Sequence, residues 1–396
     1  MFYLLFRKGY IDVYFVAAIG LLAYFFPYLF IESDTELYLL TSIPLMCFLL
    51  NYIFSDILIK KPAIPQYKET SNLIFISMVF TLLMLAVLIY QAGVIGFISG
   101  QEGSYSLHVY GFFVSALSIG LVLSALHKKK KYFIIFTLLM LMLFITGTRT
   151  HLVMAILSLF VLLNLGKKTR IVYLFTKLNY IFIFIFVFVL GVLGKDIYAS
   201  IAVSILQNSS FFSVLAERLN QFSFIEILSR TEPFHVAGMF QLIQENNFRI
   251  NSSYMLDLPF HFLPVSGGLT NSLHWFSESI KAEFYAGWSK EAGVSSNFWA
   301  EGFALYGLYG LFLFTLIWNV VLWLFNYIFY KAEGSVKALA LLSGVFWGFY
   351  IHRNSMFQII SHEKRVIYGY ILLVLLTLIY KGVINVSFIN RRSNIQ

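Results

Sequence analysis

The stretches KDIYASIAV at residues 195–203 and EAGVSSNFW at residues 291–299 bound the segment that decides the fold. Strongly apolar sequence lies on both sides of this segment, residues 195–297, which is the one long part of the chain without the pattern of a membrane span. Three of the eight histidines lie within it. We therefore predict a large extracytoplasmic (periplasmic) loop that folds as a cap over a cleft between membrane helices.

The composition of the whole chain defines the class of protein. Of its 396 residues, 59% are hydrophobic and only 12% are charged. Soluble domains carry about 25% charged residues, so this composition excludes an ordinary soluble protein and predicts an all-α polytopic membrane protein. We treat residues 1–396 as a single integral membrane domain that contains the 195–297 loop. The net charge of +9 then reflects basic cytoplasmic loops, and we expect no nucleic-acid partner.

Apolar runs of spanning length predict about 10 transmembrane helices, because a span needs about 20 mostly apolar residues. Most Lys and Arg residues fall in alternate loops between these runs. The positive-inside rule therefore places both termini of this multi-pass membrane protein in the cytoplasm. The runs lie at about 10–30, 37–59, 73–99, 108–126, 132–147, 151–166, 178–194, 298–330, 336–352 and 366–387.

The two shortest runs, 132–147 and 151–166, flank the sequence TGTRT. Gly147 can end one helix, and a threonine can cap the next, which places Arg149 at a helix start. A cation at that position opposes the helix dipole by about 0.3–1 kcal/mol. A bound anion would offset this cost, and the alternative is an arginine that reaches lipid headgroups.

Within the loop, Arg230 is a second candidate for anion binding. Thr231 can cap a helix with Pro233 in its first turn, so Arg230 should lie beside free backbone N–H groups. A helix start with an adjacent arginine suits an anionic ligand. The alternative is an ion pair between Arg230 and Glu226 or Glu232.

Two places near the end of the loop offer a proton acceptor. His274, Glu278 and Lys281 recur at helical spacing, so one helix face could carry a base and a cation. Glu301 lies at the predicted start of a span, where an ionisable side chain is costly and is a functional candidate by default. Structural pairing of Glu301 with an arginine is the alternative. Glycines that allow close helix packing follow it at positions 302, 307 and 310.

With these features, the chain resembles the bacterial O-antigen and capsule repeat-unit polymerases of the Wzy type. The resemblance covers most of the chain. It lies in the layout of spans around one late outer loop, in TGTRT at a hairpin tip, in FLP before GG and Lys281, and in Glu301 followed by Gly307 and Gly310. It implies a mainly helical membrane fold like that of C-type glycosyltransferases, located in the bacterial inner (cytoplasmic) membrane.

The related O-antigen ligases carry His-Asn, then nine residues, then Gly and a second Gly three positions on. Here that frame reads Ser296-Asn297, then Gly307 and Gly310. The histidine is missing, which argues against a ligase and leaves the identity of the general base open.

The resemblance implies a membrane glycosyltransferase that transfers a growing undecaprenyl-diphosphate-linked glycan onto a new lipid-linked repeat unit. Arginines bind a diphosphate leaving group well, because the planar guanidinium donates two hydrogen bonds at once. The candidates on the outer side are more numerous than one such clamp needs, so some should be structural. They are Arg149, Arg218, Arg230, Arg249 and Arg353. A carboxylate or imidazole would accept the proton of the attacking hydroxyl, and the candidates are Glu301, Glu278 and His274.

No cofactor or metal is expected, because the outer loops contain no Asp-x-Asp pair and no metal-spaced His/Cys cluster. The expected partners are the undecaprenyl-diphosphate-linked oligosaccharide, membrane lipid and a chain-length regulator protein. An O-antigen ligase is the nearest alternative. A lipid-linked oligosaccharide flippase or other transporter is a second alternative, although the two matching halves typical of transporters are absent from the sequence.

Overall fold

The computed structural model describes residues 8–30, 35–58, 71–98, 107–145, 149–165, 168–170, 231–263, 276–285 and 296–393, together with most of 193–220 and residue 226. These residues are almost entirely helical. The one short sheet pairs β1 (Lys8–Tyr10) with β2 (Lys168–Arg170) in an antiparallel ladder that sets Lys8 opposite Arg170.

Five of the described helices are long and apolar enough to cross a membrane. They confirm the prediction of an all-α membrane protein. The count of about 10 spans stays a prediction, and the run at 178–194 lies outside the described residues. The five candidate spans are Ser71–Val94, His108–Leu126, Leu308–Lys331, Gly334–Arg353 and Met356–Gly382.

Several predicted runs coincide with helices to within a few residues. They form α2 (Val13–Phe25), α3 (Thr35–Leu58), α4 (Ser71–Ile98) and α5 (Leu107–Leu126). The predicted hairpin around TGTRT is also present as α6 (Lys130–Ile145) and α7 (Arg149–Leu163), which pack against each other. Arg149 is the first residue of α7, as the capping pattern predicts.

The run at 298–330, predicted as one span, is instead two helices. α15 (Phe298–Tyr306) ends at Gly307, whose backbone has φ 61° and ψ −138°, and α16 (Leu308–Lys331) begins directly after it. α15 folds back against α16, and a Cβ atom on Gly310 would lie 1.9 Å from the carbonyl oxygen of Gly302. The predicted glycines therefore do permit close packing, but they do so within one helical hairpin.

The last predicted runs are also longer in the structure than their apolar residues suggest. α17 (Gly334–Val345) continues through one π-helical turn, η4 (Phe346–Tyr350), and one 3-10 turn, η5 (Ile351–Arg353). α18 (Met356–Ser393) begins ahead of its predicted start at 366 and includes the charged run HEKR at 362–365. Within this run Glu363 is buried and accepts a hydrogen bond from Ser343 at 2.7 Å, whereas Arg365 is exposed.

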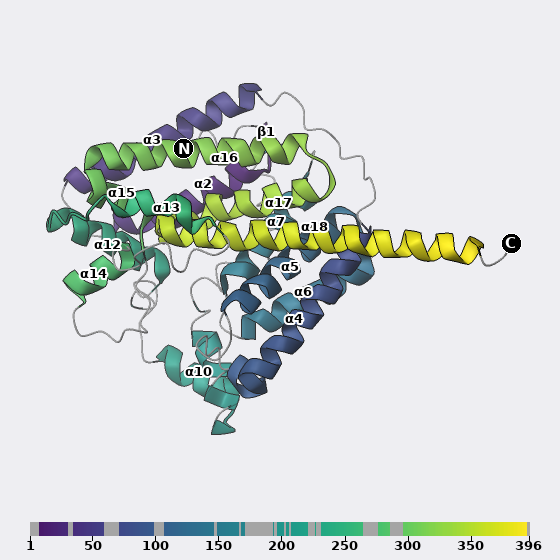
Figure 1. The fold of residues 1–396 in the computed structure, drawn as a ribbon. Helices are drawn as coiled ribbons and strands as arrows, with labels where there is room; N and C mark the ends of the chain where they lie inside the picture. Colours follow the sequence, from purple (N-terminus) through teal and green to yellow (C-terminus); the bar gives the residue numbers. More distant parts are fainter. Residues whose placement is uncertain are drawn as a thin grey trace.

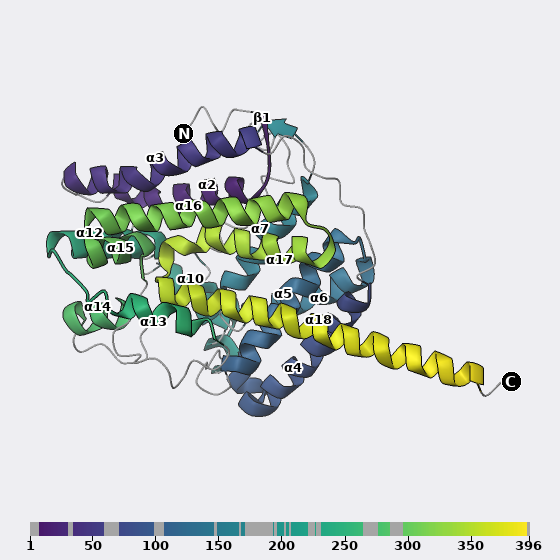
Figure 2. The same ribbon diagram turned by 45° about the horizontal axis from the view of Figure 1, so that its top comes forward.

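α5 is the central helix of the bundle and packs against α4, α6, α7, α17 and α18 (Figure 1). α17 also packs against α16, and α16 in turn against α3, so these helices form successive layers on one side of α5. Figure 2 shows α3 and α16 running side by side, and α18 extending beyond the other helices toward its C-terminal end.

The helices in the described part of the predicted 195–297 loop are short. They are α10 (Phe211–Asn220), α12 (Glu232–Glu245), α13 (Tyr254–His261) and α14 (Phe276–Phe284). α12 packs against α2, α15 and η5, and α13 packs against α18. These contacts attach this part of the predicted 195–297 loop to the membrane helices.

Candidate functional site

A small polar pocket of about 30 Å³ lies where the first turns of α5 and α7 meet the first third of α18. It combines two imidazoles, a guanidinium, a phenol and two hydroxyls within a bundle of apolar helices. The residues that line it are Tyr110, Gly111, Val114, Ser115, Ser118, His151, Met154, Leu342, His362, Arg365 and Val366.

Helical spacing explains how these side chains reach one place. His362, Arg365 and Val366 are three and four residues apart on α18, so they share one face of that helix. The face packs against α5, where Gly111 leaves room for the arginine, since a Cβ atom there would lie 3.0 Å from Cδ of Arg365. The pocket therefore depends on a glycine of one helix and an arginine of another.

Three rings form a stack beside the pocket. The His362 ring lies on Phe346 with centroids 3.7 Å apart and planes 5° apart, and the His151 ring lies 5.7 Å from His362 at 19°. Among the described residues, neither ring nitrogen of His362 has a hydrogen-bond partner, and both are buried. Each such buried group costs about 1–3 kcal/mol. An arrangement this costly is a candidate for function.

The electrostatic environment of the pocket favours an anion. α5 and α7 both begin at this end of the bundle, and the first turn of a helix carries a partial positive charge. Arg365 lines the pocket, and Arg149 begins α7 two residues before His151, about 3 Å away along the helix axis. Of the nominated arginines that the structure describes, Arg149 is thus the one whose helix position lies beside the pocket.

Arg353 has a partner in the structure. Its guanidinium forms an ion pair with Glu232, the first residue of α12, and lies 5.8 Å from the centroid of the Tyr350 ring. The sequence alternative paired Arg230 with Glu226 or Glu232, and it stays a prediction because Arg230 lies outside the described residues. The ion pair that the structure does show connects α12 to η5, and the role of Arg353 in diphosphate binding stays a prediction.

Arg249 and Arg218 lie on segments other than those that line the pocket. Nη1 of Arg249 donates to the carbonyl oxygen of Phe303 at 2.8 Å, and its guanidinium lies over the Phe303 ring at 4.8 Å from the centroid. Arg249 is exposed and lies beside the α15–α16 turn at Gly307. Arg218 is half-buried on α10. Neither side chain lines the pocket.

Glu301 is fully buried within α15, and its Oε2 accepts a hydrogen bond of 2.6 Å from the backbone N–H of Met356. Met356 is the first residue of α18, where a negative charge stabilises the helix start. This geometry favours a positioning role for Glu301, which joins α15 to α18 about 9 Å along the axis from His362. Its assignment as the general base stays a prediction.

The two roles predict different results for Glu301→Gln. The glutamine amide oxygen can still accept from Met356, so we expect the variant to insert, to lose about 1 kcal/mol of stability and to keep most activity. A general base at this position would instead be lost completely, because the amide cannot take a proton. Polysaccharide length at matched membrane abundance distinguishes these outcomes.

The other two candidate bases do not line the pocket either. Glu278 is an exposed residue of α14 that pairs with Lys281 at 3.6 Å, which confirms the helical spacing predicted for these two residues. His274 lies outside the described residues. Within the described ranges, no group of three or more His, Cys, Asp or Glu side chains is placed to hold a metal ion.

Sequence reasoning missed His151, His362 and Arg365. Two signals in the sequence could have found them. His151 follows Arg149 by two residues in TGTRTH, and the run HEKR at 362–365 precedes an apolar stretch directly. Ionisable residues at such positions are functional candidates in a membrane protein.

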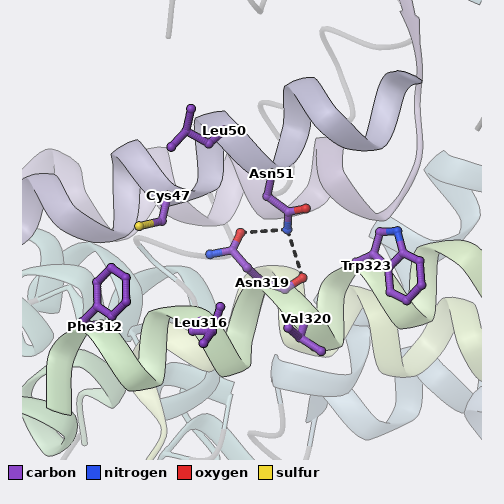
Figure 3. A pocket seen from close by; sticks show the side chains of 8 residues that line it. All are labelled: Cys47, Leu50, Asn51, Phe312, Leu316, Asn319, Val320 and Trp323. Atoms are coloured by element: carbon purple, nitrogen blue, oxygen red, sulfur yellow. Dashed lines mark hydrogen bonds between the residues drawn. The ribbon is translucent and has the colours of Figure 1, made fainter. Parts of the chain in front are cut away.

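A second concave surface is a groove of about 300 Å³ between α3 and α16. Its lining is mainly apolar, and its two asparagines are hydrogen-bonded: Nδ2 of Asn51 donates to Oδ1 of Asn319 at 2.8 Å and to the carbonyl oxygen of Asn319 at 2.9 Å (Figure 3). No charged side chain lines this groove. We therefore assign it to helix packing and lipid contact.

The asparagine pair should contribute measurably to stability. Asn51→Ala removes both donated bonds and also the acceptor of the Tyr14 hydroxyl, so we expect it to destabilise the protein by about 1 kcal/mol. Leu50→Ala is the matched control, because Leu50 lines the same groove, is 55% exposed and has no side-chain hydrogen-bonding group. Thermal unfolding in detergent measures both variants, and equal losses would contradict a specific role for the pair.

Comparison of the chain with models of protein families, with curated proteins and with solved structures finds no match.

Proposed function

We propose that this chain is a polysaccharide polymerase, a membrane glycosyltransferase of surface polysaccharide (O-antigen) biosynthesis. It would transfer a growing glycan from undecaprenyl diphosphate onto a new lipid-linked repeat unit at the periplasmic face. The observation that carries the proposal is the cationic pocket. Sequence reasoning nominates Arg149 for a diphosphate, and the helix that Arg149 begins lines a pocket that also holds His151, His362 and Arg365.

The proposed reaction needs cationic groups beside the reacting atoms, because a negatively charged group leaves. The acceptor hydroxyl attacks the anomeric carbon of the glycan, and undecaprenyl diphosphate departs with the electron pair of the broken bond. Fixed cations and helix dipoles that face the leaving group stabilise the developing charge, and the low dielectric of a membrane bundle strengthens this effect. One such donor is typically worth about 10²–10³ in rate.

The position of the pocket supports a lipid-linked substrate. The lining residues belong to the candidate spans His108–Leu126, Gly334–Arg353 and Met356–Gly382 and to the apolar helix α7. A diphosphate bound beside the first turns of α5 and α7 would lie at the end of apolar helices, so its prenyl chain could stay in the hydrocarbon region. The charge asymmetry of the loops places this end on the periplasmic side.

Electrophoresis of surface polysaccharide from a strain that lacks this protein tests the proposal. We expect a single repeat unit on the lipid core, with the ladder of longer chains restored by the wild-type gene. The absence of any attached repeat would instead indicate a ligase or a flippase. An unchanged ladder would contradict all three functions.

A further inference from the structure

We infer that His151 accepts the proton of the attacking hydroxyl through one water molecule held in the pocket between α5, α7 and α18. This inference rests on the proposed polymerase function and names the residue that sequence reasoning left open.

The size of the pocket decides how a proton could leave the substrate. A volume of about 30 Å³ is enough for one water, which needs roughly 10–15 Å³ and two to four polar partners, but it is too small for a sugar ring. The polar partners are present, because Tyr110, Ser115 and Ser118 line the same space as His151. A general base can act through one intervening water.

His151 has the better placement of the two stacked histidines. Both histidines are half-buried residues of the pocket wall, but both ring nitrogens of His362 are buried, whereas no ring nitrogen of His151 is among the buried, unpartnered side-chain atoms of the described residues. The stack on His362 and Phe346 holds the plane of the His151 ring. His151 also lies two residues after Arg149, so the proton acceptor and the proposed diphosphate ligand share the first turn of α7.

The described carboxylates nominated as bases are engaged elsewhere. Glu301 is enclosed by protein and holds the N-terminal backbone of α18, and Glu278 pairs with Lys281 on the exposed helix α14. Neither of them lines the pocket between α5, α7 and α18. An imidazole ring can accept a proton at one nitrogen in its neutral form, which is the property that the reaction needs.

The proposed step is balanced. The acceptor oxygen forms a bond to the anomeric carbon as the bond from that carbon to the diphosphate oxygen breaks. The acceptor hydroxyl gives its proton to the pocket water, and that water gives a proton to the imidazole of His151. Undecaprenyl diphosphate leaves with the electron pair, and release of the proton from His151 to solvent completes the cycle.

The test uses the purified full chain in lipid nanodiscs with a lipid-linked repeat unit as substrate. We expect His151→Gln to lower turnover at least 100-fold, in line with the 10²–10⁴-fold typical of general bases, while binding of undecaprenyl diphosphate changes less than about threefold. His127→Gln is the matched control, since His127 follows the opposite end of α5, and it should match the wild type.

Chemical rescue separates proton transfer from a structural role. His151→Ala leaves space for a free imidazole, so added imidazole should raise the turnover of this variant at least tenfold. The turnover of His127→Gln should not change when imidazole is added. Wild-type turnover in His151→Gln, or no rescue of a folded His151→Ala, would overturn the inference while leaving the polymerase function intact. Failure of the wild type to join any lipid-linked repeat units would overturn both.

Discussion

Replacing Arg149 by lysine should reduce polymer nearly as much as replacing it by alanine, by about a hundredfold or more, although lysine keeps the charge. A guanidinium holds two phosphate oxygens at once in a fixed geometry, whereas an ammonium is a compact point charge. Arg149 begins α7, and α7 packs against α5, α6 and α17. A lysine has little freedom to compensate in that setting.

The measurement is polymer length and amount at matched membrane abundance, with binding of undecaprenyl diphosphate to each purified variant. Arg170→Lys, in the strand β2, is the matched control and should behave as the wild type. An arginine that merely reaches headgroups would give another pattern, because lysine reaches them equally well. Wild-type polymer and wild-type lipid binding in Arg149→Lys would remove Arg149 from the diphosphate site.

Of the glycine-to-alanine substitutions in the described part of the chain, Gly310→Ala should destabilise the protein most. Its Cβ atom would lie 1.9 Å from the carbonyl oxygen of Gly302, so one of the two helix backbones of the α15–α16 hairpin must move. Overpacking of this kind costs about 1–3 kcal/mol, and we expect the upper end because the clash is with backbone. The displaced α15 carries Glu301, so the start of α18 should loosen as well.

Thermal unfolding in detergent and membrane abundance measure this effect. Gly238→Ala is the control, because a Cβ atom there has no neighbour within 4 Å and alanine favours a helix over glycine by about 1 kcal/mol. We expect a lower unfolding midpoint for Gly310→Ala and an equal or higher one for Gly238→Ala. Equal midpoints for Gly310→Ala and the wild type would contradict the close packing of α15 on α16.

The helices that could be predicted from sequence are those whose ends carry local signals. The hairpin α6–α7 was predictable because the sequence TGTRT contains glycine and threonine, residue types that favour helix ends and helix starts. The division of residues 298–330 was not, because an apolar run gives no sign of reversal, and a single glycine such as Gly307 is common within membrane helices. The backbone conformation at Gly307 is fixed by the tertiary contact between Gly302 and Gly310.

In the candidate site, too, local features could be predicted from sequence and tertiary contacts could not. Arg149 could be nominated because its cost at a helix start is a local property. The role of Glu301 depends on Met356, 55 positions away in the chain, and the pocket joins residues of α5, α7, α17 and α18. No spacing within one segment reveals that His151 and His362 stack, so these two residues could not be brought together before the helices were placed.

Reconstitution of the purified protein with lipid-linked repeat units tests the central claim most directly. The measurement is the length of the lipid-linked glycan together with the amount of undecaprenyl diphosphate released. The proposed function predicts chains of two or more repeats and one undecaprenyl diphosphate released for each new linkage, both strongly reduced in Arg149→Lys. Transfer of the intact lipid-linked unit across the bilayer without any new linkage, or no reaction of the unit at all, would contradict it.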